Sequence, residues 1–303
     1  MYSSNDKNLI DRILQASLKL ARMKDRNTLE TFKKMRKAAK PPKIMENMFS
    51  ISTENAFSRN IWTLAPFQNR NKYHILFLHG GSYTVNITPV HWFLIGALIN
   101  KLQCTVIVPD FPLAPEHNAE DVFEMMVPVY KGLVEKVGSK RLILMGDSSG
   151  GGLALALSQN LHENGIQQAS GLFLLSPWLD VNMDNPEIQS IDKLDPILNI
   201  KGLIDCGIAY AGELDRKNYL ISPLFGSMEG LPPIKLFVGT HDILMPDCRK
   251  FKEKAENTGL DLDYHEIKGL LHDGMLYPTP EGKLCRAEII KKLRNTWKME
   301  EHV

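Results

Sequence analysis

Short, nearly continuous apolar runs recur along the chain from about residue 72 onward, and longer stretches of mixed character separate them. The runs lie at residues 73–78, 104–108, 141–145, 171–175, 234–238 and 262–267. Their length and their β-branched and aromatic content predict strands that are buried on both faces of a sheet. The stretches between them predict helices near residues 119–137, 150–164, 247–258 and 281–298. This alternation predicts an α/β fold with a mostly parallel central sheet flanked by helices.

Two segments do not fit the alternation. Residues 8–23 predict an amphipathic helix with one apolar face. That face consists of Leu9, Ile10, Ile13, Leu14, Leu20 and Ala21. A second helical stretch is expected to end near Lys40, before two prolines. Residues 180–220 form a polar, partly helical insertion. Because ligands bind at the carboxyl ends of parallel strands, we expect residues 1–45 and about 180–220 to form a helical cap over that end of the sheet.

The composition is that of an ordinary globular protein and excludes several classes of function. Hydrophobic residues make up 44% and charged residues 23% of the 303 positions. The formal net charge of +1 gives no reason to expect nucleic acid as a partner. No run of about 18 apolar residues occurs, so we expect no membrane span.

The cysteines bear on redox compartment and metal binding. The chain has four of them, Cys104, Cys206, Cys248 and Cys285. They form no CxxC pair and no Cys/His spacing suited to zinc, so we expect neither a disulfide framework nor a metal. Scattered thiols, and the lack of an apolar run behind a basic N-terminus, favour a cytoplasmic location. The sequence leaves open whether the chain forms a homo-oligomer.

The strongest chemical signal is GDSSG at residues 146–150, which satisfies G-x-S-x-G. It directly follows the strand predicted at 141–145 and opens the helix predicted at 150–164. A turn this tight needs small residues around the serine, whose Oγ then projects from the strand end. A glycine-rich helix start without catalysis is the alternative, and Ser149 is a second serine at the same turn. The glycine spacing favours Ser148 as the nucleophile.

A second glycine-containing run, HGGSY at residues 79–83, follows the first predicted strand. Loops of this type bring backbone N–H groups close to a substrate carbonyl oxygen, which glycine permits because it has no side chain. The expected oxyanion donors are the amides of Gly80, Gly81, Ser82 and Ser149. The sequence leaves open which of the first three are used. His79 is expected to brace the loop, and a plain tight turn is the alternative reading.

The catalytic base must follow the nucleophile and the acid along the chain in this arrangement. The histidines that lie late enough are His241, His265, His272 and His302. His241 directly precedes the candidate acid, His265 lies inside a predicted strand, and His302 is the penultimate residue. His272 lies in the loop after the last predicted strand, where its imidazole can reach Ser148. We therefore assign His272 as the base.

The acid is expected after the strand predicted at 234–238. Asp242 lies there, 94 residues after Ser148 and 30 before His272. Its carboxylate would hold the imidazole in the required tautomer and stabilise the imidazolium. Asp247 is the alternative, but it has the position of a helix N-cap. Asp242 is therefore the predicted acid.

Six ordered motifs together resemble the hormone-sensitive-lipase-like esterases, which are carboxylesterases of the α/β-hydrolase fold. The motifs are HGGSY (79–83), DFPLAPE (110–116), GDSSGGGLA (146–154), LLSPWLD (174–180), LPPIKLFVGTHDILMPD (231–247) and LLHDGM (270–275). The resemblance covers about residues 72–285. It implies an α/β-hydrolase catalytic domain over residues 46–303, a helical cap and an enzyme without a cofactor.

The chain departs from the usual pattern of that family at three places. Ser82 stands where a third glycine is common, and Ser149 where alanine is more usual. Because the oxyanion donors are backbone amides, the function can survive these two changes. Asp273 and Gly274 replace a common Gly-Phe pair, which removes an aromatic ring near the site.

The leading hypothesis is hydrolysis of short-chain carboxylic esters, with a small-molecule ester as substrate and an acyl-enzyme on Ser148. An amidase or formamidase is a second hypothesis, because fold and triad do not fix the leaving group. A ligand receptor on the same scaffold is a third. The resemblance implies that such receptors lose the base, so the presence of His272 argues against a receptor.

Overall fold

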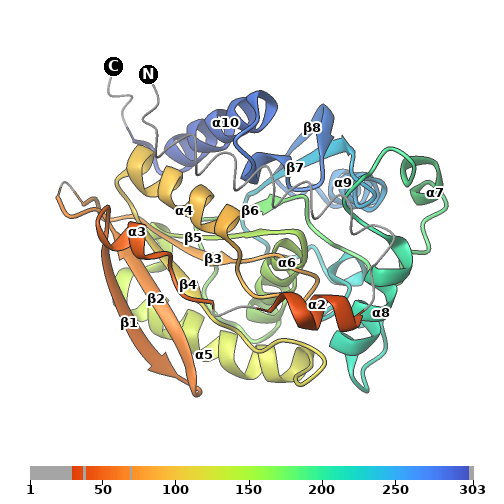
Figure 1. The fold of residues 1–303 in the computed structure, drawn as a ribbon, viewed down its shortest axis with the longest axis horizontal. Coiled ribbons are helices and arrows are strands. Elements are labelled where there is room, and N and C mark those ends of the chain that lie inside the picture. The colour runs from red at the N-terminus through yellow and green to blue at the C-terminus, as the bar shows by residue number, and fades with distance from the viewer. Residues whose placement is uncertain (1–28, 37–38, 69, 300–303) are drawn as a thin grey trace.

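The computed structural model describes residues 29–36, 39–68 and 70–299, and Figure 1 shows their arrangement. The amphipathic helix predicted over residues 8–23 lies outside these described residues. Within them, an eight-stranded sheet crosses the molecule and helices cover both of its faces.

The sheet contains all six predicted strands and two more. The strands are β1 (Ser50–Ala56), β2 (Arg59–Ala65), β3 (His74–Leu78), β4 (Thr105–Pro109), β5 (Leu142–Asp147), β6 (Gly171–Leu175), β7 (Ile234–His241) and β8 (Leu262–Leu271). Their order across the sheet is β1-β2-β4-β3-β5-β6-β7-β8, and every neighbouring pair from β4 onward is parallel. The predicted α/β fold with a mostly parallel sheet is therefore confirmed.

The apolar pattern did not predict the hairpin of β1 and β2. β1 pairs antiparallel with β2, and β2 pairs antiparallel with β4. β1 forms the edge of the sheet, and all of its residues are exposed or half-buried. An edge strand in water needs no continuous apolar run, so the polar sequence SISTENA carries no clear strand signal.

Two layers of helices cover the sheet. The short helix α3 (Lys43–Glu46) lies at the end of the N-terminal segment predicted as cap. The helices outside the predicted cap are α4 (Pro89–Leu102), α5 (Ala119–Val137), α6 (Ser148–Glu163), α9 (Met245–Thr258) and α10 (Pro280–Thr296), and the short 3-10 turns are η2 (Ser139–Arg141), η3 (Pro223–Phe225) and η4 (Gly274–Leu276). α4 and α10 pack on one face, whereas α5, α6 and α9 pack on the other. The prediction missed α4, because this helix is buried around most of its circumference and lacks a polar face.

Alternation along β3 shows how one strand serves both helix layers. Ile75 and Phe77 belong to the apolar cluster shared with α4 and α10. Leu76 and Leu78 belong to the cluster shared with α5 and α6. Successive side chains leave a strand on opposite faces, so a strand covered on both sides has no position at which a polar residue meets water.

β8 runs four residues farther than predicted, to Leu271 rather than to residue 267. An irregularity in the pairing between Gly239 and His241 of β7 accompanies this extension, and beyond it Leu271 pairs with His241. The apolar pattern stops earlier because Lys268 and Gly269, the first two residues of the extended part, are exposed. As a result, His272 directly follows the last residue of the strand.

The insertion predicted at 180–220 contains α7 (Ile188–Ile191) and α8 (Ile200–Ala211). α8 packs through Leu203 and Tyr210 into the same core as α6. The described part of the N-terminal segment includes α2 (Leu29–Met35), which lies against α8. The two predicted cap segments therefore meet, whereas the boundaries of the cap stay a prediction. No helix within the described ranges has both the length and the apolar character to cross a membrane.

Candidate active site

β5 turns into α6 at Ser148, which is the first residue of the helix. Its φ of 52° lies in the left-handed region, a strained conformation for a residue with a side chain. A Cβ on Gly146 would collide with the carbonyl of Gly150, and a Cβ on Gly150 would collide with the carbonyl of Leu78. Strand, turn and helix can come this close only because both positions are glycine.

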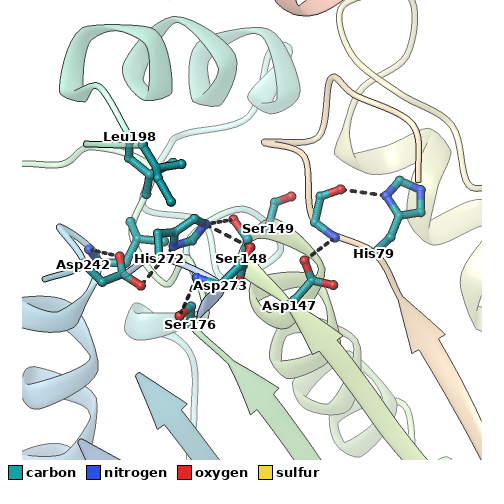
Figure 2. Close-up of polar contacts among 12 residues, drawn as sticks. His79, Asp147, Ser148, Ser149, Ser176, Leu198, Asp242, His272 and Asp273 are labelled. Atoms are coloured by element: carbon teal, nitrogen blue, oxygen red, sulfur yellow. Dashed lines mark hydrogen bonds and ion pairs between the residues drawn. The ribbon is translucent and has the colours of Figure 1, made fainter. Parts of the chain in front are cut away.

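Ser148, His272 and Asp242 follow three different strands, yet their side chains form one chain of hydrogen bonds (Figure 2). Ser148 Oγ lies 3.0 Å from His272 Nε2, and His272 Nδ1 lies 2.9 Å from Asp242 Oδ2. The other carboxylate oxygen of Asp242 accepts the amide of Leu244 at 2.9 Å. All three side chains are buried. The structure thus brings together the residues assigned from the sequence as nucleophile, base and acid.

The charges around His272 favour its protonated form. Burial alone would lower the pKa of this imidazole, but the carboxylates of Asp242 and Asp273 outweigh burial and raise it well above its ordinary value. A proton on Nδ1 faces Asp242, which leaves Nε2 to exchange a proton with Ser148. A hydroxyl, an imidazole and a carboxylate in this order can activate the serine as a nucleophile.

The other late histidines have different surroundings. His241 is the last residue of β7 and is half-buried. His265 lies within β8, where its ring stacks on Phe237 with the centroids 4.5 Å apart. Its Nε2 lies 2.9 Å from an oxygen of Asp263. His302 lies outside the described residues.

Asp247, the alternative acid, was expected to cap the N-terminus of α9, and this expectation is wrong. The N-cap residue is Leu244, and Asp247 lies inside the first turn of the helix. Its buried carboxylate accepts a hydrogen bond from Asn185 Nδ2 at 2.9 Å. Burial raises the pKa of Asp247 to about 6. The residue therefore ties α9 to the insertion.

Two hydrogen bonds join the loop after β3 to the nucleophile turn. The amide of Gly80 donates to Asp147 Oδ2 at 3.0 Å (Figure 2). The amide of Tyr83 donates to Ser149 Oγ at 3.2 Å. The hydroxyl of Ser149, which departs from the usual alanine, thus holds this loop in place. The amide of Gly80 is already engaged with a carboxylate.

Other amides near the turn remain without such partners. Those of Gly81 and Ser82 find no acceptor within the described part of the chain. Gly81 has a φ of 122°, a backbone conformation that side chains rarely tolerate. The amide of Ser149 lies in the first turn of α6, where the N–H groups lack partners inside the helix. These amides are available to an oxyanion.

His79 braces its own loop, as expected. Its ring stacks on Phe111 with the centroids 4.5 Å apart. Its Nδ1 lies 2.7 Å from the carbonyl oxygen of Gly80 (Figure 2). Burial lowers the pKa of His79 to about 4. The neutral ring therefore donates from Nδ1 to the loop carbonyl.

Asp147 carries a contact that the motif did not predict. Its Oδ2 lies 3.0 Å from His91 Nε2, and both side chains are buried. Burial alone would lower the pKa of His91, but the Asp147 carboxylate raises it. His91 lies on α4, the helix missed from the sequence, so no sequence signal connected the two residues.

Asp195 of the insertion is a second residue that sequence reasoning missed. Its Oδ1 accepts the amides of Ile197 and Leu198 at 2.8 and 2.9 Å. Its Oδ2 accepts the amide of Ile243, the neighbour of Asp242, at 3.1 Å. Burial and the nearby Asp242 carboxylate raise the pKa of Asp195. No motif marks this residue, because its partner lies in a loop distant in sequence.

Asp273 touches the base itself. Its Oδ2 lies 3.1 Å from His272 Nε2, the nitrogen that also faces Ser148. The sequence marked position 273 as a departure from the family pattern, but the expected consequence was only the loss of an aromatic ring. The contact with the imidazole could not be read from the sequence.

The chain is similar to a known protein family and to two curated relatives. Residues 75–276 match the profile of a protein family described as having the alpha/beta hydrolase fold. An esterase of Acinetobacter venetianus is 33% identical over 220 residues, which are 71% of this chain and 72% of the esterase. An acetyl-hydrolase of Streptomyces hygroscopicus is 29% identical and covers 69% of this chain and 71% of its own length.

A solved structure shows the same fold. The crystal structure of an esterase from the bacterial hormone-sensitive lipase family aligns with a TM-score of 0.78. The alignment covers 98% of this chain and 100% of the esterase at 24% identity. At this identity the likeness concerns the fold alone.

Proposed function

This chain belongs to the α/β-hydrolase family, and we propose that it hydrolyses carboxylic esters through an acyl-enzyme formed on Ser148. The continuous chain of hydrogen bonds from Ser148 through His272 to Asp242, with distances of 3.0 and 2.9 Å, carries this proposal. The predicted resemblance to esterases of the α/β-hydrolase fold is confirmed by the family match and by the relatives.

In the first half of the reaction, Ser148 Oγ attacks the ester carbonyl carbon while its proton passes to His272 Nε2. Asp242 keeps Nδ1 protonated and stabilises the imidazolium. The Nε2 proton then passes to the leaving alcohol oxygen as the carbon–oxygen bond breaks. In the second half, water attacks the acyl carbon and gives its proton to Nε2. The bond between the acyl carbon and Ser148 Oγ then breaks, the Nε2 proton returns to Oγ, and the carboxylic acid is released.

The negative charge that develops on the carbonyl oxygen needs hydrogen-bond donors. We assign this role to the amide of Ser149 together with those of Gly81 and Ser82, since the amide of Gly80 already donates to Asp147 at 3.0 Å. Each donor of this kind contributes on the order of 10²–10³ in rate. Because these groups are backbone amides, serine at positions 82 and 149 is compatible with the role.

The proposed substrate is a small ester with a short acyl group. One relative is named an acetyl-hydrolase. The insertion is joined to the site by Asp195 and by the stacked rings of Tyr83 and Tyr210, whose centroids are 3.6 Å apart. A pocket enclosed by such a cap limits the length of the acyl chain.

The four cysteines are free and buried, which supports the proposed cytoplasmic location.

A fluorophosphonate probe combined with matched substrates tests the proposal. We expect the probe to label Ser148, and p-nitrophenyl esters to be hydrolysed faster than p-nitroanilides with the same acyl group. Faster hydrolysis of the anilides would favour an amidase instead. A protein that is never labelled at Ser148 would contradict a serine-dependent mechanism.

A further inference from the structure

Asp273 and Ser148 approach the same nitrogen of His272. Ser148 Oγ lies 3.0 Å and Asp273 Oδ2 lies 3.1 Å from Nε2, and Figure 2 shows both side chains beside the imidazole. Asp273 is buried, and its backbone amide donates to Ser176 Oγ at 3.3 Å, which fixes the main chain at this position. Its Oδ1 is buried without a hydrogen-bond partner among the described residues.

This geometry creates a competition for one proton. A neutral Nε2 with a lone pair can accept the proton of Ser148, as the general-base step requires. A protonated Nε2 can instead donate to the Asp273 carboxylate at 3.1 Å. An ionised carboxylate this close to an imidazole favours the imidazolium, which cannot act as the base. Asp273 therefore opposes the loss of the Nε2 proton from His272, although His272 must lose this proton before it can act as the base.

We propose that Asp273 is a second acidic partner of the catalytic imidazole, which holds a proton on Nε2 in the resting enzyme and shifts activity toward alkaline pH. This inference rests on the proposed function, because it takes His272 as the base of Ser148. In the reaction, Nε2 carries the serine proton while the tetrahedral intermediate exists, and Asp273 stabilises that imidazolium from the side opposite to Nδ1. The proton still ends on the leaving alcohol oxygen.

The ionisable groups around Asp273 shift its pKa in both directions. Those that interact with it come from several elements: Asp242 and His272 at the ends of β7 and β8, Asp147 of β5, His91 of α4 and Tyr277 after η4. From α10, Arg286 directs its guanidinium to the carbonyls of Met275 and Tyr277. Burial raises the pKa of Asp273 to about 7, although His272 opposes the shift. Asp273 is therefore ionised above about pH 7, where its carboxylate favours the protonated form of His272.

Two substitutions separate charge from shape at this position. Asp273→Asn keeps the size of the side chain and removes its negative charge. Asp273→Gly restores the residue common in the family, and the φ of 51° at this position suits glycine without strain. If Asn at this site disturbs the fold, Gly provides an independent measurement. Asp247→Asn is a matched control, because Asp247 is also a buried carboxylate with a raised pKa but binds Asn185.

The experiment measures kcat/KM for p-nitrophenyl acetate, and the rate of fluorophosphonate labelling of Ser148, between about pH 5 and pH 10. We expect both Asp273 variants to move the midpoint of the acid limb down by about 1 pH unit or more. Below the wild-type midpoint they should therefore be about tenfold more active than the wild type. The alkaline plateau should not rise, because the carboxylate also stabilises the imidazolium in the transition state. Asp247→Asn should leave the midpoint in place.

The outcomes distinguish this inference from the proposed function. A uniform loss of activity at every pH, with the midpoint unmoved while the wild type is labelled at Ser148, would mean that Asp273 has a structural role only. Failure of the wild type to be labelled at any pH would overturn the assignment of the triad and this inference with it. A lowered midpoint in both Asp273 variants, by substrate turnover and by labelling alike, would support a second carboxylate on the base.

Discussion

Asp195 Oδ2 accepts the amide of Ile243 at 3.1 Å, although the two residues lie 48 positions apart. Ile243 directly follows Asp242, the proposed acid. Asp195 also accepts the amides of Ile197 and Leu198 in its own turn. One buried carboxylate of the insertion therefore supports both its own loop and the loop that positions the acid.

Asp195→Ala should lower kcat/KM by about 10- to 100-fold, because the substitution leaves buried amides without an acceptor and loosens the loop that carries Asp242. The effect is measured with p-nitrophenyl acetate. Asp215→Ala is the control, since Asp215 is an exposed residue of the same insertion that accepts the amide of Lys217 at 2.8 Å. Equal activity of the two variants would show that the contact with Ile243 is dispensable.

Ser148→Ala should reduce ester hydrolysis by about 10⁴-fold or more, because the members of a catalytic triad act as a unit. Ser149→Ala removes only the hydroxyl that accepts the amide of Tyr83 and keeps its own backbone amide. The esterase activity of Ser149→Ala should therefore stay within about tenfold of that of the parent, as expected for the loss of one hydrogen bond. The comparison requires only steady-state assays and circular dichroism to verify folding. A Ser148→Ala protein with activity near that of the parent would exclude the assigned nucleophile.

His272→Ala should be nearly as damaging as loss of the nucleophile, on the order of 10⁴-fold. Asp242→Asn should cost about 10³-fold or more, because the amide no longer holds the required tautomer of the imidazole. His265→Ala is the control, since His265 stacks on Phe237 within β8 and should be nearly neutral for activity. Loss of activity in His265→Ala with full activity in His272→Ala would reverse the assignment of the base.

His91→Ala should lower the free energy of unfolding by about 3–5 kcal/mol, because it leaves the buried Asp147 carboxylate without its imidazole partner. Urea unfolding monitored by fluorescence gives this quantity directly. The matched control is His117→Ala, which breaks a His–Asp pair with Asp121 whose side chains are 40% and 44% exposed. This exposed pair should contribute less than about 1 kcal/mol. Similar decreases in the free energy of unfolding for both variants would show that the buried His91–Asp147 pair contributes no more stability than the exposed pair.

The parallel strands could be predicted from the sequence because a strand between two helix layers has no polar position. Ile75 to Leu78 show this directly, with alternate side chains in the two apolar clusters. The same reasoning could not find β1, whose side chains face water or lie at the edge. It also missed α4, because a helix buried on nearly all sides loses the periodicity that marks a helix.

The nucleophile turn and the order of the proposed triad could be predicted because both follow from local backbone geometry and from chain order. The supporting carboxylates could not. Asp195, Asp147 and Asp273 act through partners that the fold, rather than the local sequence, brings within reach. The departure from the family pattern at position 273 marks this residue as unusual, but its contact with His272 depends on the direction that the fold gives to the side chain.

The described part of the N-terminal segment is bonded to loops that border the site. Arg36 donates from Nε to the carbonyl of Thr84 at 2.6 Å, and its Nη1 lies 2.5 Å from a carboxylate oxygen of Glu116. It also donates to the carbonyl of Ala114. Thr84 lies just beyond the oxyanion loop, so the N-terminal segment and the proposed oxyanion donors share a structural support.

Deleting residues 1–40 should therefore lower ester hydrolysis and weaken acyl-chain selectivity, because it removes Arg36 and the α2 helix that packs on α8. The intact chain should prefer acyl groups of about two to six carbons, as an enclosed pocket limits the chain that fits. Rates with p-nitrophenyl esters of increasing length measure both effects, and fluorophosphonate labelling of Ser148 shows whether the nucleophile turn still forms. Arg36→Ala removes the Arg36 contacts from the full-length chain, and it should likewise lower ester hydrolysis and weaken acyl-chain selectivity. A profile of the intact chain that peaks at about twelve carbons or longer, or one that the deletion leaves unchanged, would show that these residues do not shape an acyl pocket.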